Sequence, residues 1–485
     1  MTEFLAQTLW EGRLFDGAWN SAPVCMPVRE PATGDALAQA GFGDPQAVAR
    51  VAAAAAAAQP GWRDTSPETR ARIVRDAARL LETHAAEAIA WIVRETGSVR
   101  PKAEVEVRGS ISELHEAAAL PTQPQGQVLP SPDVERLSLG LRVPLGVVGV
   151  ITPWNFPLIL GLRSVAPALA LGNAVVLKPD PKTPVSGGVL IARLFEEAGL
   201  PAGLLSVLPG DADVGEALVT DPSVRMITFT GSTAVGRRVG ELAGKHLKRV
   251  SLELGGNNAM IVLDDADVDL ASSAGAWGSF LHQGQICMST GRHIVHRRVA
   301  EPYLEKLAAR AAALPVGDPF REQVALGPII SQRQLDRVHR IVTESVDAGA
   351  ELRAGGTYEG PFYKPTVLGR VQTEMPAFRE EIFGPVAPVI VVADDDEAVA
   401  VANASDYGLS AAIRTGSLDR GLALARKIRA GMVHVNDQTV NDAAYAPFGG
   451  VGISGNGARF GSPSNVDEFT EWQWVTAGRQ TGYPF

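Results

Sequence analysis

The segment HQGQICMST, residues 282–290, contains Cys287, one of only two cysteines in a chain of 485 residues. The residues just before it, Gln283, Gly284 and Gln285, are small or polar, so Cys287 need not lie in apolar packing. A free cysteine is most often a small, buried, apolar residue, but in a polar setting its thiolate is a nucleophile. The segment therefore has two interpretations, a packed structural cysteine or a catalytic one.

Two further segments carry groups that could take part in chemistry. In LELGGNN, residues 252–258, Glu253 lies in an apolar, strand-like run, and a buried glutamate is costly unless it is paired or functional. In GSTAVG, residues 231–236, small residues and a hydroxyl follow the strand-like MITFT. Backbone N–H groups at such a strand-to-helix turn can meet a phosphate. A glycine turn of this kind is also common as a purely structural feature of α/β proteins.

Composition excludes several classes of protein. The length predicts two or more domains, and 46% hydrophobic with 20% charged residues is typical of a globular protein. The formal net charge of −10 argues against a nucleic-acid partner. Cys25 and Cys287 give neither a disulfide framework nor a zinc spacing, so we expect no metal and a reducing, cytoplasmic location. The N-terminal residues show no secretory-signal pattern.

One apolar stretch, residues 143–162, is long enough to suggest a membrane span. Pro153, Trp154, Asn155 and Pro157 lie at its middle, where an isolated spanning helix would lose backbone hydrogen bonds. We therefore expect no interaction with a membrane.

The elements that must position these groups alternate along the chain. Short apolar runs that end at turn residues are typical of buried parallel strands, and they occur at 147–152, 174–179, 204–209 and 226–231. Helical composition is found at 45–59, 66–95, 185–199 and 211–219. We expect the first of these helices to end at Pro60 and Gly61. Alternating strands and helices predict βαβ units and an open parallel sheet of the dinucleotide-binding type.

A second alternating half follows. Its helix-like segments are 300–314, 331–349, 395–403 and 418–430. Its strand-like segments are 386–392 and 431–436. Residues 123–142 and 468–478 also have strand-like patterns, and we expect them to lie outside the two main cores.

Taken in order, five segments identify a family. They are PWNFP (153–157), LELGGNN (252–258), HQGQICMS (282–289), EEIFGPV (380–386) and PFGG (447–450). This set resembles the NAD(P)-dependent aldehyde dehydrogenase superfamily. The resemblance implies an α/β fold with three parts: a Rossmann-type cofactor domain, an α/β catalytic domain and a small bridging β-flap that joins subunits. These parts correspond to 1–122 with 143–254, to 255–460, and to 123–142 with 461–485.

The resemblance also implies roles for three residues. Cys287 corresponds to the nucleophile, whose thiolate attacks the aldehyde carbon to give a thiohemiacetal and then, after hydride transfer, a thioester. The Asn155 amide corresponds to the oxyanion donor, together with the backbone N–H of Cys287. Glu253 corresponds to the general base that activates water against the thioester. The presence of Glu253 argues against an alternative relative that acylates coenzyme A, and all three argue against a non-catalytic protein on this fold.

For the cofactor, the resemblance implies NAD, with NADP as the alternative. Lys178 is expected at the adenosine ribose, Trp154 and Ser232 near the pyrophosphate, and Glu381 and Phe383 at the nicotinamide ribose and ring. The other expected cofactor contacts are Ile151, Thr152, Pro153, Gly210, Gly231 and Leu254.

Two positions depart from the family pattern. In KPDPKTP, Pro181 stands where many members carry a glutamate, so the choice between NAD and NADP stays open. Gly452 follows PFGGV where a lysine or similar residue is usual, and the sequence offers no role for it.

For the substrate, the segment VNDQTVNDAAYAPFGG (435–450) and KPDPKTP are most similar to the aromatic-aldehyde branch. That branch comprises the benzaldehyde, vanillin and salicylaldehyde dehydrogenases, of which benzaldehyde dehydrogenases are the most similar. The expected pocket residues suit a flat apolar ring: Phe156, Leu160, Arg163, Leu281, Ile286, Met288 and Tyr445. The alternative is an enzyme for aliphatic or other small aldehydes. The expected partners are the aldehyde and further copies of the chain, in a homodimer or a homotetramer.

Overall fold

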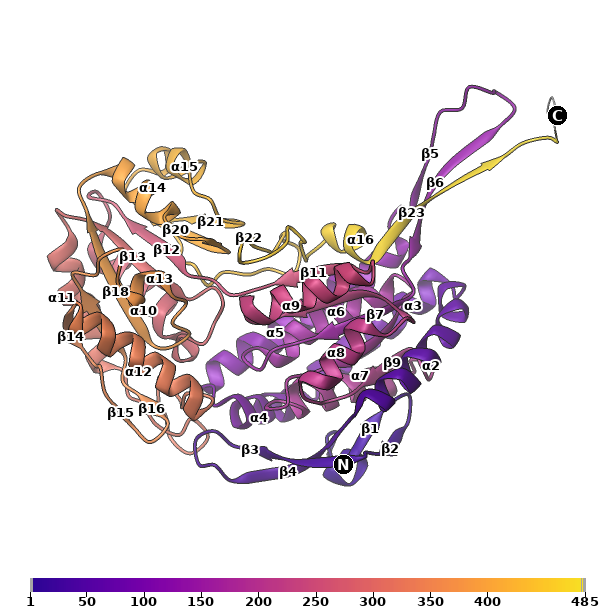
Figure 1. The fold of residues 1–485 in the computed structure, drawn as a ribbon, viewed down its shortest axis with the longest axis horizontal. Helices are drawn as coiled ribbons and strands as arrows, with labels where there is room; N and C mark the ends of the chain where they lie inside the picture. Colours follow the sequence, from indigo (N-terminus) through magenta and orange to yellow (C-terminus); the bar gives the residue numbers. More distant parts are fainter. Residues whose placement is uncertain (1–2, 481, 483–485) are drawn as a thin grey trace.

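The computed structural model describes residues 3–480 and residue 482. Figure 1 shows two lobes and a thin arm of strands that projects away from them. The expected segments 1–122 and 461–485 include the chain ends. Of these two segments, only residues 1–2, 481 and 483–485 lie outside the described residues.

The first lobe is centred on a seven-stranded sheet in the order β11-β10-β7-β8-β9-β1-β2. Its parallel strands are β7 (Val147–Ile151), β8 (Ala174–Lys178), β9 (Leu205–Val207), β10 (Val224–Thr230) and β11 (Arg249–Glu253). One edge is extended in antiparallel fashion by β1 (Arg13–Phe15) and β2 (Trp19–Ser21). Every residue of β7 and β8 is buried, as expected for strands that helices cover on both faces. The four strands predicted here are confirmed, with ends that differ by one or two residues.

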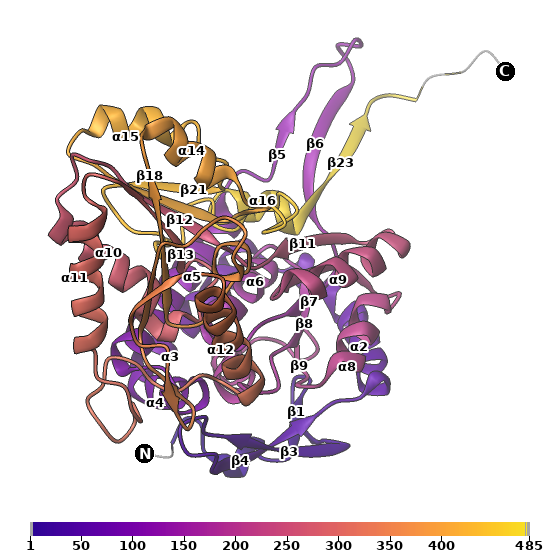
Figure 2. The same cartoon turned by 60° about the vertical axis from the view of Figure 1, so that its left-hand side comes forward.

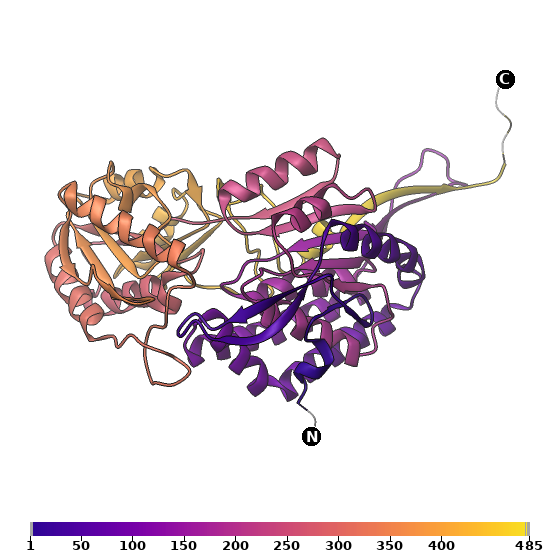
Figure 3. The ribbon, with the colours of Figure 1, turned by 60° about the horizontal axis from the view of Figure 1, so that its bottom comes forward.

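Helices surround this sheet (Figure 3). They are α1 (Gln7–Trp10), α2 (Pro45–Arg63), α3 (Pro67–Thr83), α4 (Ala85–Thr96), α5 (Arg100–Ala119), α6 (Pro157–Ala170), α7 (Leu190–Glu197), α8 (Ala212–Thr220) and α9 (Thr233–Lys245). The predicted helix 66–95 is divided into α3 and α4 at His84. Two features were not predicted from the sequence: α5, and the outer hairpin of β3 (Val24–Arg29) and β4 (Ala36–Phe42).

The prediction that the first helix ends at Pro60 and Gly61 is wrong, because α2 continues to Arg63. Pro60 lies in the last turn, where its missing N–H removes only one helical hydrogen bond. The extra residues carry Trp62 into the core, where its indole N–H donates to the backbone carbonyl of Leu169 at 2.8 Å. Burial of this large ring outweighs the loss at the proline.

The second lobe contains another seven-stranded sheet, in the order β14-β17-β18-β13-β12-β20-β21. Its strands are β12 (Asn258–Val262), β13 (Thr290–His296), β14 (Glu351–Ala354), β17 (Thr366–Gly369), β18 (Val386–Val392), β20 (Ser410–Arg414) and β21 (Met432–Val435). Its helices are α10 (Val268–Phe280), α11 (Ala300–Ala313), α12 (Gln332–Asp347), α13 (Pro376–Arg379), α14 (Asp395–Asn403) and α15 (Leu418–Ala425). The predicted elements of this half are confirmed, except that α15 ends five residues before the predicted end at 430.

Alternate residues of β18 pack into different cores. Ala387 and Val389 join the core under α10 and α11, whereas Val386 and Ile390 join the core under α12. Successive side chains on a strand point to opposite faces, so these helices cover the two faces of the sheet (Figure 2). This packing holds α12 on the face of the sheet opposite α10 and α11.

Small strand pairs join the remaining segments: β15 (Tyr358–Glu359) with β16 (Phe362–Tyr363), and β19 (Tyr407–Gly408) with β22 (Val451–Gly452). The second pair explains Gly452. This residue has a φ of +65°, and a Cβ atom on it would lie 2.3 Å from the carbonyl oxygen of Asp406. A lysine at this position would therefore be strained and would collide with the backbone.

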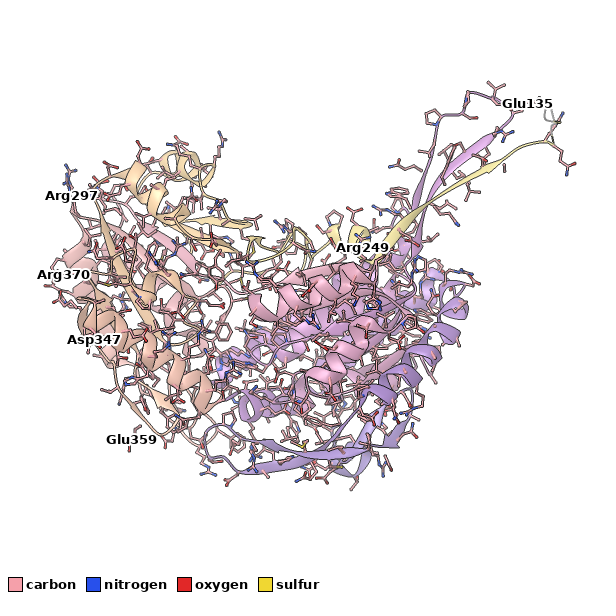
Figure 4. The ribbon with its side chains drawn as sticks, in the orientation of Figure 1. Glu135, Arg249, Arg297, Asp347, Glu359 and Arg370 are labelled. Atoms are coloured by element: carbon pink, nitrogen blue, oxygen red, sulfur yellow. The ribbon has the colours of Figure 1, made fainter. Side chains whose placement is uncertain are left out.

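The arm consists of β5 (Gly126–Val128), β6 (Leu137–Pro144) and β23 (Thr470–Ala477) in the order β23-β6-β5, and α16 (Ser464–Phe469) leads into it. All eight residues of β23 pair with β6 in antiparallel register. Figure 4 labels Glu135 at the outer end of the arm and Arg249 at its base. The two segments predicted to lie outside the main cores therefore form one sheet.

Within the part of the chain that the structure describes, no helix is both long and apolar enough to cross a membrane. The apolar stretch 143–162 is instead shared by the end of β6, by β7 and by the first turns of α6.

Candidate active site

Cys287 lies on a loop with an unusual backbone conformation. His282 and Gln283 have φ angles of 50° and 56°, which residues with side chains rarely adopt. The Gln283 amide donates to the backbone carbonyls of Gly97 and Pro328 at 3.0 and 2.9 Å. These bonds fix the loop to two distant segments, while Cys287 itself remains only half-buried.

Cys287 lies between two cavities. The larger has a volume of about 240 Å³, and the smaller a volume of about 160 Å³. Asn155 and Leu160 line both cavities together with Cys287. The sulfur is therefore placed where two molecules entering from different sides would meet.

The larger cavity is mainly apolar. Six of the seven expected pocket residues line it: Phe156, Leu160, Arg163, Leu281, Ile286 and Met288. Other apolar residues that line the cavity were not predicted from the sequence: Val105, Ile159, Trp277, Val440 and Phe448. Two of these had a signal, since Ile159 lies on the helix that carries Phe156 and Leu160, and Phe448 belongs to the PFGG motif.

Tyr445, the seventh expected pocket residue, does not line this cavity. Its side chain is 69% exposed, whereas Ala444 and Phe448 on the same segment are buried. A turn closed by the hydrogen bond from Ala446 N–H to the Ala443 carbonyl leaves Tyr445 on the outer side of the segment. The placement of Tyr445 in the pocket is therefore corrected.

Arg163 forms a charged part of the cavity wall. Its guanidinium donates to Glu113 at 2.9 Å and to Asp442, and it lies 4.5 Å from the centre of the Phe448 ring. Burial raises the pKa of Glu113 to about 7, against the opposite effect of Arg163. The arginine is thus held by two carboxyl groups and does not enter the cavity as a free cation.

Asn155 is positioned by a buried ion pair. Lys102 Nζ donates to Oε2 of Glu106 at 2.6 Å and to the Asn155 carbonyl at 2.7 Å. Oε1 of Glu106 accepts the N–H of Leu158 at 2.9 Å, near the start of α6. The Asn155 amide in turn donates to the carbonyl of Gln285 at 3.0 Å. These bonds hold the amide group against the loop that carries Cys287.

Glu253 ends β11 and is almost fully buried, yet neither of its carboxyl oxygens has a hydrogen-bond partner among the described residues. It lines a third space of about 10 Å³ together with Cys287, Thr230 and Phe448. That volume is close to the smallest that holds one water molecule. Burial raises the pKa of Glu253 well above its usual value, so the carboxyl group is protonated more readily than an exposed one.

The Cys287 thiol is also shifted. Burial, together with the nearby carboxyl groups of Glu381 and Glu253, raises the pKa of this thiol to about 12. The sulfur therefore carries its proton at neutral pH, and a base must remove it before the sulfur becomes a nucleophile.

The smaller cavity lies at the carboxyl edge of the first sheet. Seven of the expected cofactor residues line it: Pro153, Trp154, Gly231, Ser232, Leu254, Glu381 and Phe383. Ser232 is the N-cap of α9, so unpaired N–H groups of this helix face the cavity edge, as in phosphate sites. Trp154 meets Phe383 edge to face, with ring centres 5.5 Å apart.

Hydrogen bonds to the carboxyl group and to the backbone carbonyl of Glu381 hold this residue at the cavity. Its Oε1 accepts the N–H of Gly256 at 2.9 Å, and burial raises its pKa to about 7. Two residues of α12 that the sequence analysis missed also line the cavity: Gln334 donates to the Phe383 carbonyl at 3.0 Å and Arg337 to the Glu381 carbonyl at 2.6 Å. No spacing in the sequence linked α12 to this site.

The other four expected cofactor residues lie outside the lining of the smaller cavity. Ile151 and Lys178 are paired at the carboxyl ends of β7 and β8, Thr152 follows β7, and Gly210 packs on Val214 of α8. Lys178 is buried, and burial lowers its pKa. These residues continue the same sheet edge beyond the cavity, which is the edge where open α/β sheets bind dinucleotides.

The fold and the site together place a cysteine beside a dinucleotide-type crevice, an arrangement typical of enzymes with a cysteine nucleophile. Comparison with known proteins agrees: residues 19–475 match the model of the aldehyde dehydrogenase family. The chain is 58% identical to a vanillin dehydrogenase of Amycolatopsis sp., over 99% of this chain and 100% of that protein. It is 50% identical to a benzaldehyde dehydrogenase [NAD(+)] of Pseudomonas putida, over 100% of both chains.

Solved structures agree as well. A salicylaldehyde dehydrogenase from Pseudomonas putida G7, crystallised with salicylaldehyde, superimposes with a TM-score of 0.95 at 35% identity, covering 98% of this chain and 100% of that one. The chain therefore belongs to the aldehyde dehydrogenase family.

Proposed function

We propose that this enzyme oxidises an aromatic aldehyde to the carboxylic acid, with NAD as the hydride acceptor. The observation that supports this most directly is the mainly apolar cavity at Cys287, lined by Phe156, Leu281, Ile286 and Phe448. Its lining suits the ring of an aromatic aldehyde, and the relatives named above are vanillin, benzaldehyde and salicylaldehyde dehydrogenases.

The reaction begins at Cys287. Glu253, which shares a space with Cys287, accepts the thiol proton, and the thiolate attacks the aldehyde carbon to give a thiohemiacetal. The Asn155 amide and the Cys287 backbone N–H stabilise the negative charge on the former carbonyl oxygen. NAD, when bound, accepts the hydride that converts this adduct into a thioester. Glu253 releases the thiol proton to solvent and is then free to take a proton from water. The water oxygen attacks the thioester carbon, the C–S bond breaks as the acid leaves, and Glu253 returns the proton to the Cys287 sulfur.

The residues of the smaller cavity fit a dinucleotide cofactor. Ser232 offers the N-terminus of α9 to a phosphate, and Trp154 and Phe383 offer flat apolar surfaces close to Cys287. Glu381 offers a carboxyl group to the hydroxyls of a ribose. Pro181 offers no carboxylate to the ribose, and Lys182 lies 3.7 Å from Asp180, which offsets its charge. We therefore assign NAD as the main cofactor, with measurable activity on NADP.

The division into domains follows the sheets. The cofactor domain comprises 1–122 and 143–254, the catalytic domain 255–460, and the flap 123–142 and 461–485. The arm exposes large apolar side chains: Val128, Val134, Leu137, Trp472 and Trp474. Exposed apolar residues on a projecting sheet suit contact with a further copy of the chain, in a homodimer or a homotetramer. Two free cysteines suit the cytoplasm.

Steady-state kinetics with benzaldehyde and acetaldehyde test the proposed substrate class. The value of kcat/KM for benzaldehyde should exceed that for acetaldehyde by at least about tenfold, since the ring buries additional apolar surface. Cys287→Ala is the control and should abolish oxidation while leaving NAD binding intact. Equal values for the two aldehydes would contradict an aromatic preference and assign the enzyme to the general aldehyde class.

A further inference from the structure

The Glu253 carboxyl group faces an arginine across a glycine. The position that a Cβ atom would occupy on Gly449 lies 2.8 Å from Oε1 of Glu253 and 2.8 Å from Nη1 of Arg459. The two charged atoms are therefore separated by no more than twice that distance. Any side chain at position 449 would collide with both of them, so the glycine keeps open the gap across which they face each other.

The Arg459 side chain is held in place by backbone carbonyls. Its Nη1 donates to Gly450 at 3.1 Å and to Ala458 at 2.8 Å. An antiparallel bridge between Phe448 and Phe460 fixes the two segments that provide these carbonyls. Among the described residues no carboxylate forms a contact ion pair with this guanidinium, so its positive charge is not neutralised by direct contact.

Four charged side chains act on Glu253. Burial raises the pKa of Glu253, and the neighbour that lowers it most is Arg459, followed by Arg163; Glu468 and Asp442 raise it. Arg163 already contacts two carboxyl groups, so its charge is largely offset. Arg459 therefore supplies the main positive potential at the base.

We propose that Arg459 is a positioning residue for catalysis, which stabilises the ionised form of Glu253 from across the Gly449 gap during hydrolysis of the thioester. This role rests on the proposed function. A contact ion pair would occupy the carboxylate oxygens and weaken them as a base. The gap avoids this: the positive charge favours the carboxylate, while its oxygens remain available to the Cys287 proton and to water.

The test is the pH dependence of turnover in Arg459→Gln. Without the positive charge, Glu253 ionises only at higher pH, so the midpoint of the acid limb of kcat should move up by about one pH unit or more, the scale expected for a charge at this separation. The hydride burst in the first turnover, followed by NADH absorbance at a pH above both midpoints, should remain near one per site. A purely structural role would lower kcat equally at every pH.

Two variants separate charge from geometry. Arg459→Lys keeps the positive charge and should restore most of the original midpoint. Gly449→Ala keeps both charged residues, but its Cβ atom would press on both of them and on the Ala458 carbonyl oxygen 2.5 Å away, so it should also move the midpoint up. Arg79→Gln is the matched control, because Arg79 is exposed on α3, pairs with Asp76 at 2.8 Å and is not among the charged side chains that act on Glu253; its midpoint should not change.

Two results would overturn the role of Arg459: an unchanged midpoint in Arg459→Gln, or failure of Arg459→Lys to restore the midpoint. Absence of any aldehyde oxidation by the unmodified enzyme would contradict the proposed function instead. The two failures are therefore distinguishable in one set of measurements.

Discussion

Two glutamates near Cys287 are both almost fully buried, but only one of them has hydrogen-bond partners. Glu106, in the wall of the larger cavity, is 1% exposed, and Glu253, in the small space beside the sulfur, is 3% exposed. Glu106 accepts hydrogen bonds from Lys102 and from the backbone N–H of Leu158, whereas the Glu253 carboxyl has none among the described residues. The same residue type thus supports structure where it is paired and is available for proton transfer where it is not.

The difference extends beyond these two residues. The other charged group in the cavity wall, Arg163, contacts Glu113 and Asp442. A wall of paired charges keeps the substrate cavity rigid and neutral, because a buried charge without a partner is unstable. A base needs free lone pairs, and the protein accepts the unfavourable burial of Glu253 to provide them.

The largest expected effect is that of Glu253→Gln on turnover. The amide cannot accept a proton from water, so kcat should fall by about 10²- to 10⁴-fold, the usual contribution of a general base. One hydride per site should still be transferred slowly in the first turnover, because Glu253 acts chiefly on the thioester. Stopped-flow measurement of NADH checks both points, and unaltered steady-state turnover would contradict the assigned role.

The same variant should change how stability depends on pH. A carboxyl group whose pKa is raised in the folded state stabilises the fold fully at a pH below its unfolded pKa, and this contribution is lost as the pH rises through the folded pKa. Because Glu253 has such a shift from 4.5, the unmodified enzyme should lose free energy of unfolding above pH 4.5 more steeply than Glu253→Gln. Denaturant titrations across this range compare the slopes. Parallel slopes would show that Glu253 is not shifted.

The next prediction concerns the paired glutamate. Glu106→Gln leaves the Lys102 ammonium buried without a charged partner, which typically costs about 3–5 kcal/mol of unfolding free energy. Glu106→Gln combined with Lys102→Met should recover part of the loss, because neither charge then remains buried. Denaturant unfolding measures both variants. If Glu106→Gln were as stable as Glu253→Gln, the paired glutamate would contribute no more to stability than the unpaired one, which would contradict the comparison.

The contrast also marks what the sequence could predict. Cys287, Glu253 and Asn155 lie in ordered motifs, and the strands β7, β8 and β10 contain runs of apolar or β-branched residues, so both could be recognised. The support around them is set by contacts between distant segments. Lys102 lies 53 residues from the Asn155 carbonyl that it holds, and no local pattern links the two.

Two errors have related causes. Tyr445 was expected in the pocket as part of a lining that suits a flat apolar ring, but the turn before Phe448 directs it outward. Pro60 was expected to end a helix, but the burial of Trp62 outweighs the local preference of proline. In both cases the local sequence predicted one arrangement, and packing against distant residues produced another.

The smallest expected effect is that of Asp442→Asn. Asp442 contacts the same arginine as Glu113, but its side chain is 22% exposed, against 3% for Glu113. Water screens the more exposed carboxylate, and Glu113 still neutralises Arg163 after the change, so the loss of unfolding free energy should be no more than about 1 kcal/mol. Because Asp442 lines the larger cavity, kcat/KM for benzaldehyde is measured alongside the unfolding curve and should change by less than about fivefold, since a 1 kcal/mol change corresponds to that factor. A loss of stability as large as that of Glu106→Gln would show that Arg163 needs both carboxylate partners. The stability of the cavity wall would then depend on the whole charged network and not only on its most deeply buried pairs.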